Sequence, residues 1–126
     1  MSNPHKGRTG AVRIAFAMRH SLRGLRTAWR GESAFRQECV LAIFLLPMAP
    51  WLGQSWLEIA LLSGSLVMVL VVELLNSAIE ATVDRVSFEM HDLSRQAKDM
   101  ASAAVMLSIL TCSSIWGLAV YHRFMP

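Results

Sequence analysis

Charged side chains are absent from two long stretches of the sequence, 40–57 and 100–121, and a third stretch, 59–72, stays uncharged until Glu73. Of the 126 residues, 54% are hydrophobic and only 17% are charged. An ordinary soluble domain of this length does not carry several such runs, whereas about 20 consecutive apolar residues are enough to cross a bilayer as a helix. The missing charge therefore argues against a soluble domain and predicts a small all-α membrane protein.

Cysteine is scarce as well, because the chain contains only Cys39 and Cys112, and both lie in apolar stretches. A small apolar packing role is favoured for them over a disulfide or a metal site. Internal repeats, low-complexity segments and long linkers are missing too, so we expect residues 1–126 to form one domain. The first apolar run follows about 30 mostly polar and basic residues, unlike a signal peptide, so we expect the first span to direct insertion.

The apolar runs predict three transmembrane helices, near residues 33–52, 58–86 and 98–121. The first of these spans contains Pro47 and Pro50 within "LPMAPWLGQ". Proline lacks the backbone N–H that continues a helix, and its ring clashes with a carbonyl group of the preceding turn. We therefore expect the first span to kink or end there, and its regular part to be shorter than a full crossing.

Lysine and arginine are distributed unevenly along the chain. Only Arg123 follows the last predicted span, and Arg85, Arg95 and Lys98 flank the second connection. The other eight of the twelve cations precede or open the first span: Lys6, Arg8, Arg13, Arg19, Arg23, Arg26, Arg30 and Arg36. By the positive-inside rule, the amino terminus and the second connection lie in the cytoplasm, and the carboxyl terminus lies on the opposite side.

Residues 12–30 have the pattern of an amphipathic helix. At about 100° per residue, one face of this segment gathers apolar side chains, and a stripe of arginines runs beside it. The face consists of Ile14, Met18, Leu22, Leu25 and Trp29, and the stripe of Arg19, Arg23, Arg26 and Arg30. This pattern predicts a helix that lies on an anionic membrane surface. Nucleic-acid binding is not indicated, because no nucleic-acid-binding motif accompanies the basic stripe.

Four polar residues interrupt the second predicted span. Helical geometry places Glu73, Asn76, Glu80 and Asp84 within an arc of roughly 80°, so they form one face, which we call the polar row. A carboxylate near the bilayer centre costs about 2.5 to 3.5 kcal/mol on insertion scales, and such groups usually face a cavity or a partner. Three helices shelter the row poorly, which predicts an oligomer with a cavity at its interface.

Depth separates the members of the polar row. Glu73 lies about 10 Å deeper in the membrane than Glu80, at 1.5 Å per residue. The shallow acids Glu32, Glu80 and Asp84 could ligate a hard cation such as Mg²⁺, and a deep carboxylate could accept a proton from a buried alcohol. The row therefore suggests a reaction between a membrane alcohol and a soluble phosphate donor. A structural hydrogen-bond network or an ion pathway remains the alternative on chemistry alone.

Three sequence motifs resemble those of a known family. "ESAFRQE" (32–38), "ELLNSAIEATVDR" (73–85) and "RQAKDMASAAV" (95–105) are similar to the characteristic stretches of the bacterial diacylglycerol kinases, in the same order. The resemblance implies a homotrimer of three-span protomers in the bacterial inner membrane, each with an amino-terminal surface helix. It also implies transfer of the γ-phosphate of MgATP to diacylglycerol, giving phosphatidic acid, at composite sites between neighbouring protomers. The glycine loop of soluble nucleotide-binding kinases is missing here, as it is in that family.

The resemblance also implies roles for individual residues. Glu73 matches the catalytic base, Asn76 and Asp84 match polar positions lining the site, and Glu32 and Glu80 match the Mg²⁺ ligands. Nucleotide contacts would come from Arg13, His20, Glu32, Glu80, Glu89, His91, Lys98 and Asp99. Contacts to the lipid substrate would come from Ala34, Phe35, Glu38, Trp51, Glu73 and Ser102. This sequence has His20 where the family commonly has tyrosine and Arg95 where glycine often stands, so details of nucleotide binding are expected to differ.

Two alternatives to a diacylglycerol kinase follow from the same residues. An undecaprenol kinase of the same superfamily has a related motif, and a small ion channel or transporter could use the polar row as an ion path. The wording "NSAIEATVDR" favours diacylglycerol as the lipid alcohol. Lys98 and Asp99, together with the basic amino-terminal helix, favour either kinase over a transporter.

Overall fold

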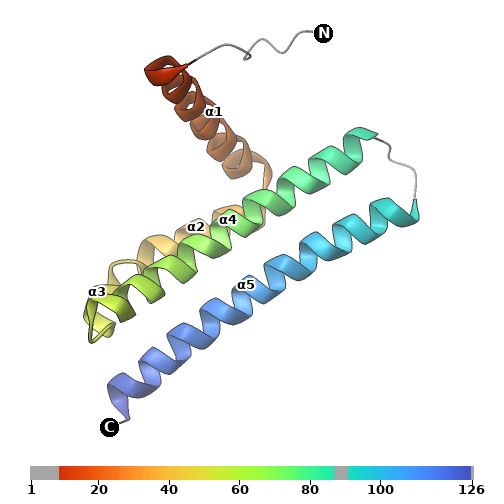
Figure 1. Ribbon diagram of the computed structural model, residues 1–126. Coiled ribbons are helices and arrows are strands. Elements are labelled where there is room, and N and C mark those ends of the chain that lie inside the picture. The colour runs from red at the N-terminus through yellow and green to blue at the C-terminus, as the bar shows by residue number, and fades with distance from the viewer. Residues whose placement is uncertain (1–8, 87–90, 126) are drawn as a thin grey trace.

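The computed structural model of the chain describes residues 9–86 and 91–125. These residues form five α-helices and no strand, which confirms the all-α class (Figure 1). The helices are α1 (Gly10–Gly31), α2 (Ser33–Leu45), α3 (Met48–Leu52), α4 (Trp56–Val86) and α5 (Asp92–Phe124).

The long helices α4 and α5 run antiparallel, side by side along most of their length (Figure 1). Both are long and apolar enough to cross a membrane, which agrees with the second and third predicted spans. At 1.5 Å per residue they are about 46 and 50 Å long, so each exceeds a hydrocarbon core of about 30 Å by several turns. The excess leaves room for polar turns outside the membrane at one end of the pair.

The first predicted span is broken into two helices. Leu45 ends α2 and Met48 begins α3, with Pro47 between them, so the expected break at the prolines is confirmed. The chain keeps hydrogen bonds around the break, from Leu46 N–H to Ala42 O at 2.8 Å and from Ala49 N–H to Leu46 O at 3.2 Å. The 13 residues of α2 rise only about 20 Å, so a complete crossing by residues 33–52 stays a prediction.

The start of α4 is fixed by a pair of reciprocal side-chain caps. The Gln54 N–H donates to the Glu58 carboxylate at 2.8 Å, and the Glu58 N–H donates to Ser55 Oγ at 3.2 Å. Such pairs satisfy backbone donors that have no partner within the first helical turn. The caps close a tight turn from α3 into α4 and hold both helices at the same end of the molecule.

Gly53 leaves no room for a side chain in this turn. A Cβ atom there would lie 2.7 Å from Ile59 Cγ1 and 3.0 Å from the Ile59 backbone nitrogen. We expect Gly53→Ala to lower the free energy of unfolding by about 1–3 kcal/mol, the usual cost of forcing extra volume into a packed site. Thermal unfolding in detergent measures the change. Gly117→Ala is the control, because a Cβ at Gly117 meets nothing within 4 Å, and an equal shift in both variants would contradict the prediction.

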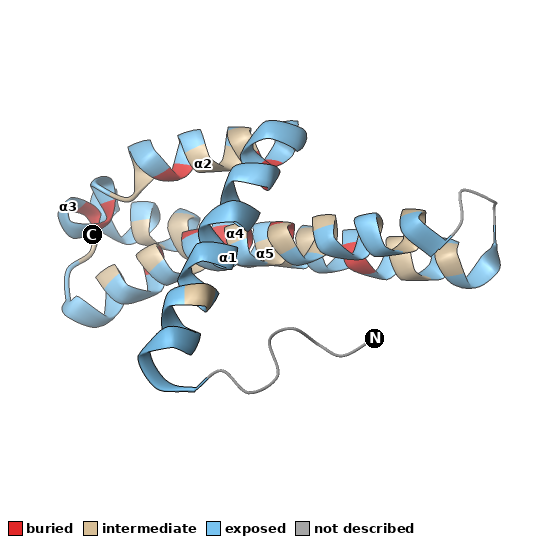
Figure 2. Ribbon diagram, turned by 90° about the horizontal axis from the view of Figure 1, so that it is seen from above, coloured by how far each residue is buried: buried red, intermediate tan, exposed pale blue. Residues whose placement is uncertain are grey.

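Helix α1 leaves the other helices at an angle and contacts them only near its carboxyl end (Figures 1 and 2). Its helical structure confirms the amphipathic helix predicted for residues 12–30. The apolar face is exposed, with 67% of Ile14 and 58% of Met18 accessible. An exposed apolar face with arginines beside it fits a membrane surface better than a solvated one.

Little of the molecule is buried, as Figure 2 shows by the small amount of red. The described core has one cluster of Ala49, Leu52 and Leu62, and another of Leu66, Val69 and Cys112. Both cysteines are free thiols, and Cys112 packs in the second cluster as a small apolar residue. Large hydrophobic side chains cover the outside of α4 and α5, so lipid or another protein surface must cover them.

Candidate active site

Glu73 is the centre of the site. Its side chain is 5% exposed, and it is the one buried charged residue in the described part of the chain. It lies within electrostatic range of three further carboxylates, those of Glu32, Glu38 and Glu80. Helices α2 and α4 and the residue between α1 and α2 therefore bring four acidic side chains to one region. Buried carboxylates gathered in this way are typical of functional sites rather than of structural cores.

Several polar atoms around Glu73 are buried without a partner. Within the described residues, Glu38 Oε2, Asn76 Oδ1 and Ser77 Oγ are inaccessible and make no hydrogen bond. An unsatisfied buried polar group costs about 1–3 kcal/mol, so native proteins rarely leave three of them together. These atoms are therefore left to pair with groups from outside the described chain.

Glu32, from the connection between α1 and α2, also belongs to the site. It is half-buried between α1 and α2 and lines a groove of about 750 Å³ between α1 and α4. His20 and Arg23 of α1 line the same groove, and so does Ser77 of α4. His20 also packs against Phe16, with ring centroids 6.5 Å apart. The groove thus combines a carboxylate, a cation and an imidazole, which suits a ligand bearing phosphates and a metal ion.

Helix α5 adds cations at the far end of the polar row. Lys98 Nζ lies 2.7 Å from Asp84 Oδ1, and the same ammonium group is also attracted by Glu80. The two paired side chains are 43% and 42% exposed, so water screens the pair and its net contribution to stability is small. Arg95 Nη1 lies 3.4 Å from Asp99 Oδ2. Lys98 and Asp99, the two nucleotide residues predicted on α5, therefore both have ion-pair partners within the chain.

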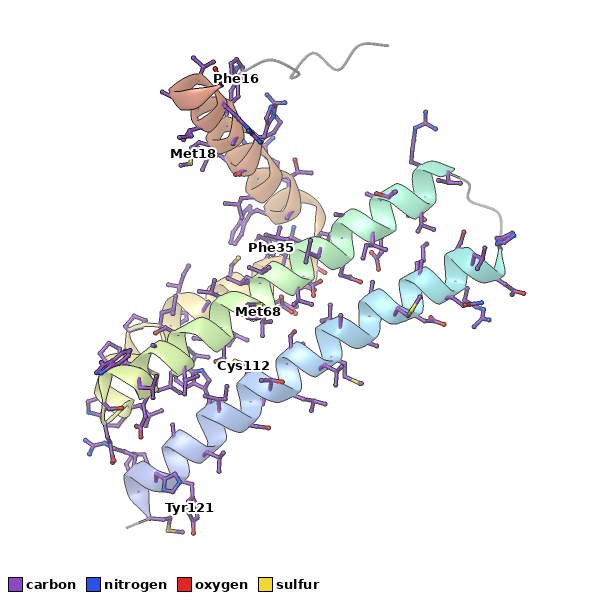
Figure 3. The ribbon with its side chains drawn as sticks, viewed as in Figure 1. Phe16, Met18, Phe35, Met68, Cys112 and Tyr121 are labelled. Carbon is purple, nitrogen blue, oxygen red and sulfur yellow. The ribbon has the colours of Figure 1, made fainter. Side chains whose placement is uncertain are left out.

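A narrow apolar groove leads away from the carboxylates. Its volume is about 210 Å³, and its lining includes Glu38 and Leu41 of α2, Leu66 of α4, and Ile109 of α5. A carboxylate at one end of an apolar groove suits a molecule with a polar head and a hydrocarbon tail. Phe35, labelled in Figure 3, lies beside the same region at the start of α2 and is only 3% exposed.

Some predicted site residues lie elsewhere. Trp51 is at the opposite end of the molecule, 6.2 Å from the Phe124 ring and 5.3 Å below the Arg123 guanidinium. Arg13 is exposed near the free end of α1, and Ala34 and Ser102 are exposed on α2 and α5. His91 accepts a hydrogen bond from the Leu93 N–H at 3.1 Å and caps α5. Glu89 lies outside the described residues. The described chain therefore brings together the carboxylates but not the whole predicted set.

Two residues near the site were not predicted from the sequence. Ser77 follows Asn76 directly and lies about 100° further round the helix, outside the arc that defined the polar row. Its burial could be recognised only once α1 and α2 were placed against α4. Arg36 hydrogen-bonds to the end of α1. The sequence feature that could have indicated this contact is a cation one turn after the break between the helices at Gly31 and Glu32.

The acidic groups of the site can be compared with what a metal ion requires. The described residues contain no group of three or more histidine, cysteine or acidic side chains placed to hold an ion. Mg²⁺ in phosphate-transfer sites usually takes one or two carboxylates from the protein and its other ligands from phosphates and water. Glu32 and Glu80 both lie within electrostatic range of Glu73, and two carboxylates are the kind of protein donor that Mg²⁺ delivered with a nucleotide takes.

The fold and the site define a class, a small helical protein whose membrane-length apolar helix carries a buried carboxylate with further acidic groups along the same face. Comparison with known families identifies the family within this class. The prokaryotic diacylglycerol kinase family matches residues 19–120. The chain is a member of this family.

Similar proteins cover nearly the whole chain. The diacylglycerol kinase of Pseudomonas aeruginosa is 50% identical over 114 residues, which are 90% of this chain and 93% of that protein. The enzyme of Escherichia coli K12 is 45% identical over 116 residues, or 92% of this chain and 95% of the relative. That of Haemophilus influenzae is 42% identical over 109 residues, covering 86% and 92%. The resemblance inferred from the sequence motifs is confirmed.

Proposed function

We propose that this protein is an ATP-dependent diacylglycerol kinase, which transfers the γ-phosphate of MgATP to the hydroxyl of diacylglycerol and forms phosphatidic acid. The observation that carries this proposal is the burial of Glu73 beside Glu32, Glu38 and Glu80 in a member of the family. A deep carboxylate next to shallower ones suits a reaction between a lipid alcohol and a soluble phosphate donor.

Glu73 acts on the lipid hydroxyl. Its carboxylate accepts the hydrogen bond of the primary alcohol, holds the oxygen in line with the γ-phosphorus, and takes up the proton as the oxygen–phosphorus bond forms; the bond from the γ-phosphorus to the bridging oxygen breaks, and ADP leaves. Phosphoryl transfer needs little covalent chemistry from a protein, so alignment and charge compensation supply most of the rate. Asn76, whose Oδ1 is buried without a partner, is placed to share in orienting the substrate.

Glu32 and Glu80 hold the metal end of the nucleotide. Mg²⁺ held by these two carboxylates would supply positive charge that offsets the negative charge of the phosphates. Glu32 belongs to the α1–α2 connection and Glu80 to α4. The position of α1 relative to α4 therefore decides whether the two carboxylates can bind the same metal ion. Lys98 pairs with Asp84 and is also attracted by Glu80. When a bound nucleotide displaces Asp84 from this pair, the Lys98 ammonium group can offset the charge of the phosphates.

The two grooves suit the two substrates. The groove between α1 and α4 contains His20, Arg23 and Glu32 and would receive the nucleotide. The narrow groove that begins at Glu38 would receive the lipid, with its apolar chains among the leucines. Glu73 lines neither groove, but along α4 it lies between Leu70, which lines the narrow groove, and Leu74, which lines the groove beside α1. Arg13, His91 and Asp99 would complete the nucleotide contacts, and Ala34, Phe35, Trp51 and Ser102 the lipid contacts.

We also propose a trimer in the bacterial inner membrane, with the amino terminus in the cytoplasm and the carboxyl terminus outside it. Each protomer would cross three times, the first crossing being made by α2 and α3 together. Support comes from the exposed apolar side chains of α4 and α5 and from the unpartnered polar atoms beside Glu73, which a neighbouring protomer would cover. Composite sites between protomers would also bring in predicted residues that one protomer leaves apart.

Assembly gives a direct prediction. We expect the purified protein to sediment as a trimer in mild detergent, because a monomer leaves the polar atoms beside Glu73 unpaired. Analytical ultracentrifugation with the detergent density matched measures the mass, and kinase activity is assayed on the same fractions. A monomer that retains full activity would contradict both the trimer and the composite site.

The function itself is tested with a panel of lipid alcohols and labelled ATP. Purified protein should transfer phosphate to diacylglycerol in mixed micelles, and it should require Mg²⁺. A strong preference for undecaprenol would identify the related kinase instead. Absence of lipid-dependent transfer to any alcohol would remove both kinases and favour an ion pathway, which flux assays in proteoliposomes would then detect.

A further inference from the structure

The side chain of Arg36 bridges the connection between α1 and α2. Helix α1 ends at Gly31 and α2 begins at Ser33, so Glu32 alone joins them, with an extended backbone at φ −118° and ψ 108°. Arg36, one turn into α2, donates from Nη1 to Trp29 O at 2.9 Å and to Arg30 O at 3.2 Å. One guanidinium group therefore links the first turn of α2 to the last turn of α1.

These hydrogen bonds satisfy groups that a helix end otherwise leaves unpaired. The last four carbonyl groups of a helix lack partners within it and form the negative end of its dipole. The Glu32 N–H takes one of them, Ala28 O, at 2.9 Å, and Arg36 takes the next two. Hydrogen bonds from a charged donor are stronger than neutral ones, so the guanidinium holds the angle between α1 and α2 more firmly than the backbone alone could.

Glu32 is held at the centre of this arrangement. Its N–H is bonded to the last turn of α1, and its carbonyl accepts the Arg36 N–H at 3.2 Å, so neither side of the residue turns freely. Its side chain lines the groove between α1 and α4, whereas Arg36 lines a separate surface recess with Trp29 and Gln37. Arg36 is thus placed to influence the groove through Glu32 and not by lining it.

We propose that Arg36 is a positioning residue, which closes the α1–α2 connection and so fixes the direction in which Glu32 presents its carboxylate to α4. The functional part of this inference rests on the proposed role of Glu32 at the metal end of the nucleotide. Its structural part, the closing of the connection, does not depend on that role and is measured separately.

The structural part is tested by hydrogen exchange on the full protein in detergent. Arg36→Gln should accelerate exchange of the Glu32 amide and its neighbours by about tenfold, the effect of losing a charge-assisted hydrogen bond at a partly exposed site. Arg26→Gln is the matched control, because it removes a cation from α1 at an exposed position and should leave this exchange unchanged. Unchanged exchange in Arg36→Gln would overturn the proposal.

The functional part is tested by a double-mutant cycle. Arg36→Gln should raise the half-saturating MgATP concentration by about tenfold and leave that of diacylglycerol within about twofold of the parent. In a Glu32→Gln background, Arg36→Gln should change the MgATP requirement no further. Fully additive effects would overturn the proposal, because Arg36 would then act on the nucleotide without Glu32.

Two further measurements separate the possible failures. Arg36→Lys keeps the positive charge but not the planar set of N–H donors. Its amide exchange rate and its MgATP requirement should therefore fall between those of the parent and those of Arg36→Gln. This variant also keeps the test valid if Arg36→Gln folds poorly. Failure of the proposed function would be visible in the parent itself, as a lack of lipid-dependent phosphate transfer. The exchange experiment on Arg36 would give its result in either case.

Discussion

Replacing Glu73 with glutamine should abolish most of the turnover while leaving MgATP binding intact. The change removes the proton acceptor for the lipid hydroxyl but keeps the size and shape of the side chain. General-base assistance is typically worth 10² to 10⁴ in rate, or roughly 3 to 5 kcal/mol, so kcat should fall by that factor. The groups proposed to hold the nucleotide are untouched, because Glu80 lies about 10 Å further along α4.

The measurement pairs lipid kinase turnover with nucleotide affinity on the same preparation. Assembly should be unimpaired, because an amide is less costly to bury than a carboxylate. Glu58→Gln is the matched control, since it makes the same chemical change at an exposed position at the other end of α4 and leaves an amide oxygen that can still accept the Gln54 N–H. Turnover of Glu73→Gln within about threefold of the parent would assign Glu73 a structural role and leave the reaction without its proposed base.

Replacing Glu80 with glutamine should produce the opposite pattern, a loss of Mg²⁺-dependent nucleotide use. Glutamine has the same size but removes the negative charge that a hard cation prefers. Substitutions of residues that only support a metal ligand cost about 10- to 100-fold in metal affinity, so loss of a ligand should cost at least the upper end of that range. The Mg²⁺ concentration needed for half-maximal activity should therefore rise about 100-fold or more.

Titration of a fluorescent ATP analogue with Mg²⁺ gives the affinity, and sedimentation gives the assembly state. Lys98 adds a second effect of opposite sign, because Glu80 is one of the acids that attract its ammonium group, and loss of that acid leaves Lys98 freer to pair with phosphate at saturating Mg²⁺. An affinity equal to that of the parent, at every Mg²⁺ concentration, would remove Glu80 from the metal site. Glu58→Gln again serves as the control.

The sequence by itself determined the helices and the line of polar groups within one of them. These features depend on spacing along the chain: apolar runs, the 100° step of a helix, and prolines that interrupt it. Residues 12–30 and 58–86 were accordingly placed within a few residues of α1 and α4, and the break near Pro47 was expected. The alignment of Glu73 with Glu80 followed from the same periodicity, because both are on one rigid helix.

The tertiary structure decided which groups from different helices meet. Glu32 reaches the groove beside α4, and Lys98 pairs with Asp84, because of how α1 and α5 pack against α4. The burial of Ser77 and the hydrogen bonds of Arg36 to the end of α1 depend on the same packing. Periodicity describes one helix at a time and carries no information about the angle between two of them. That angle is set by side-chain packing and by the few hydrogen bonds at the helix ends.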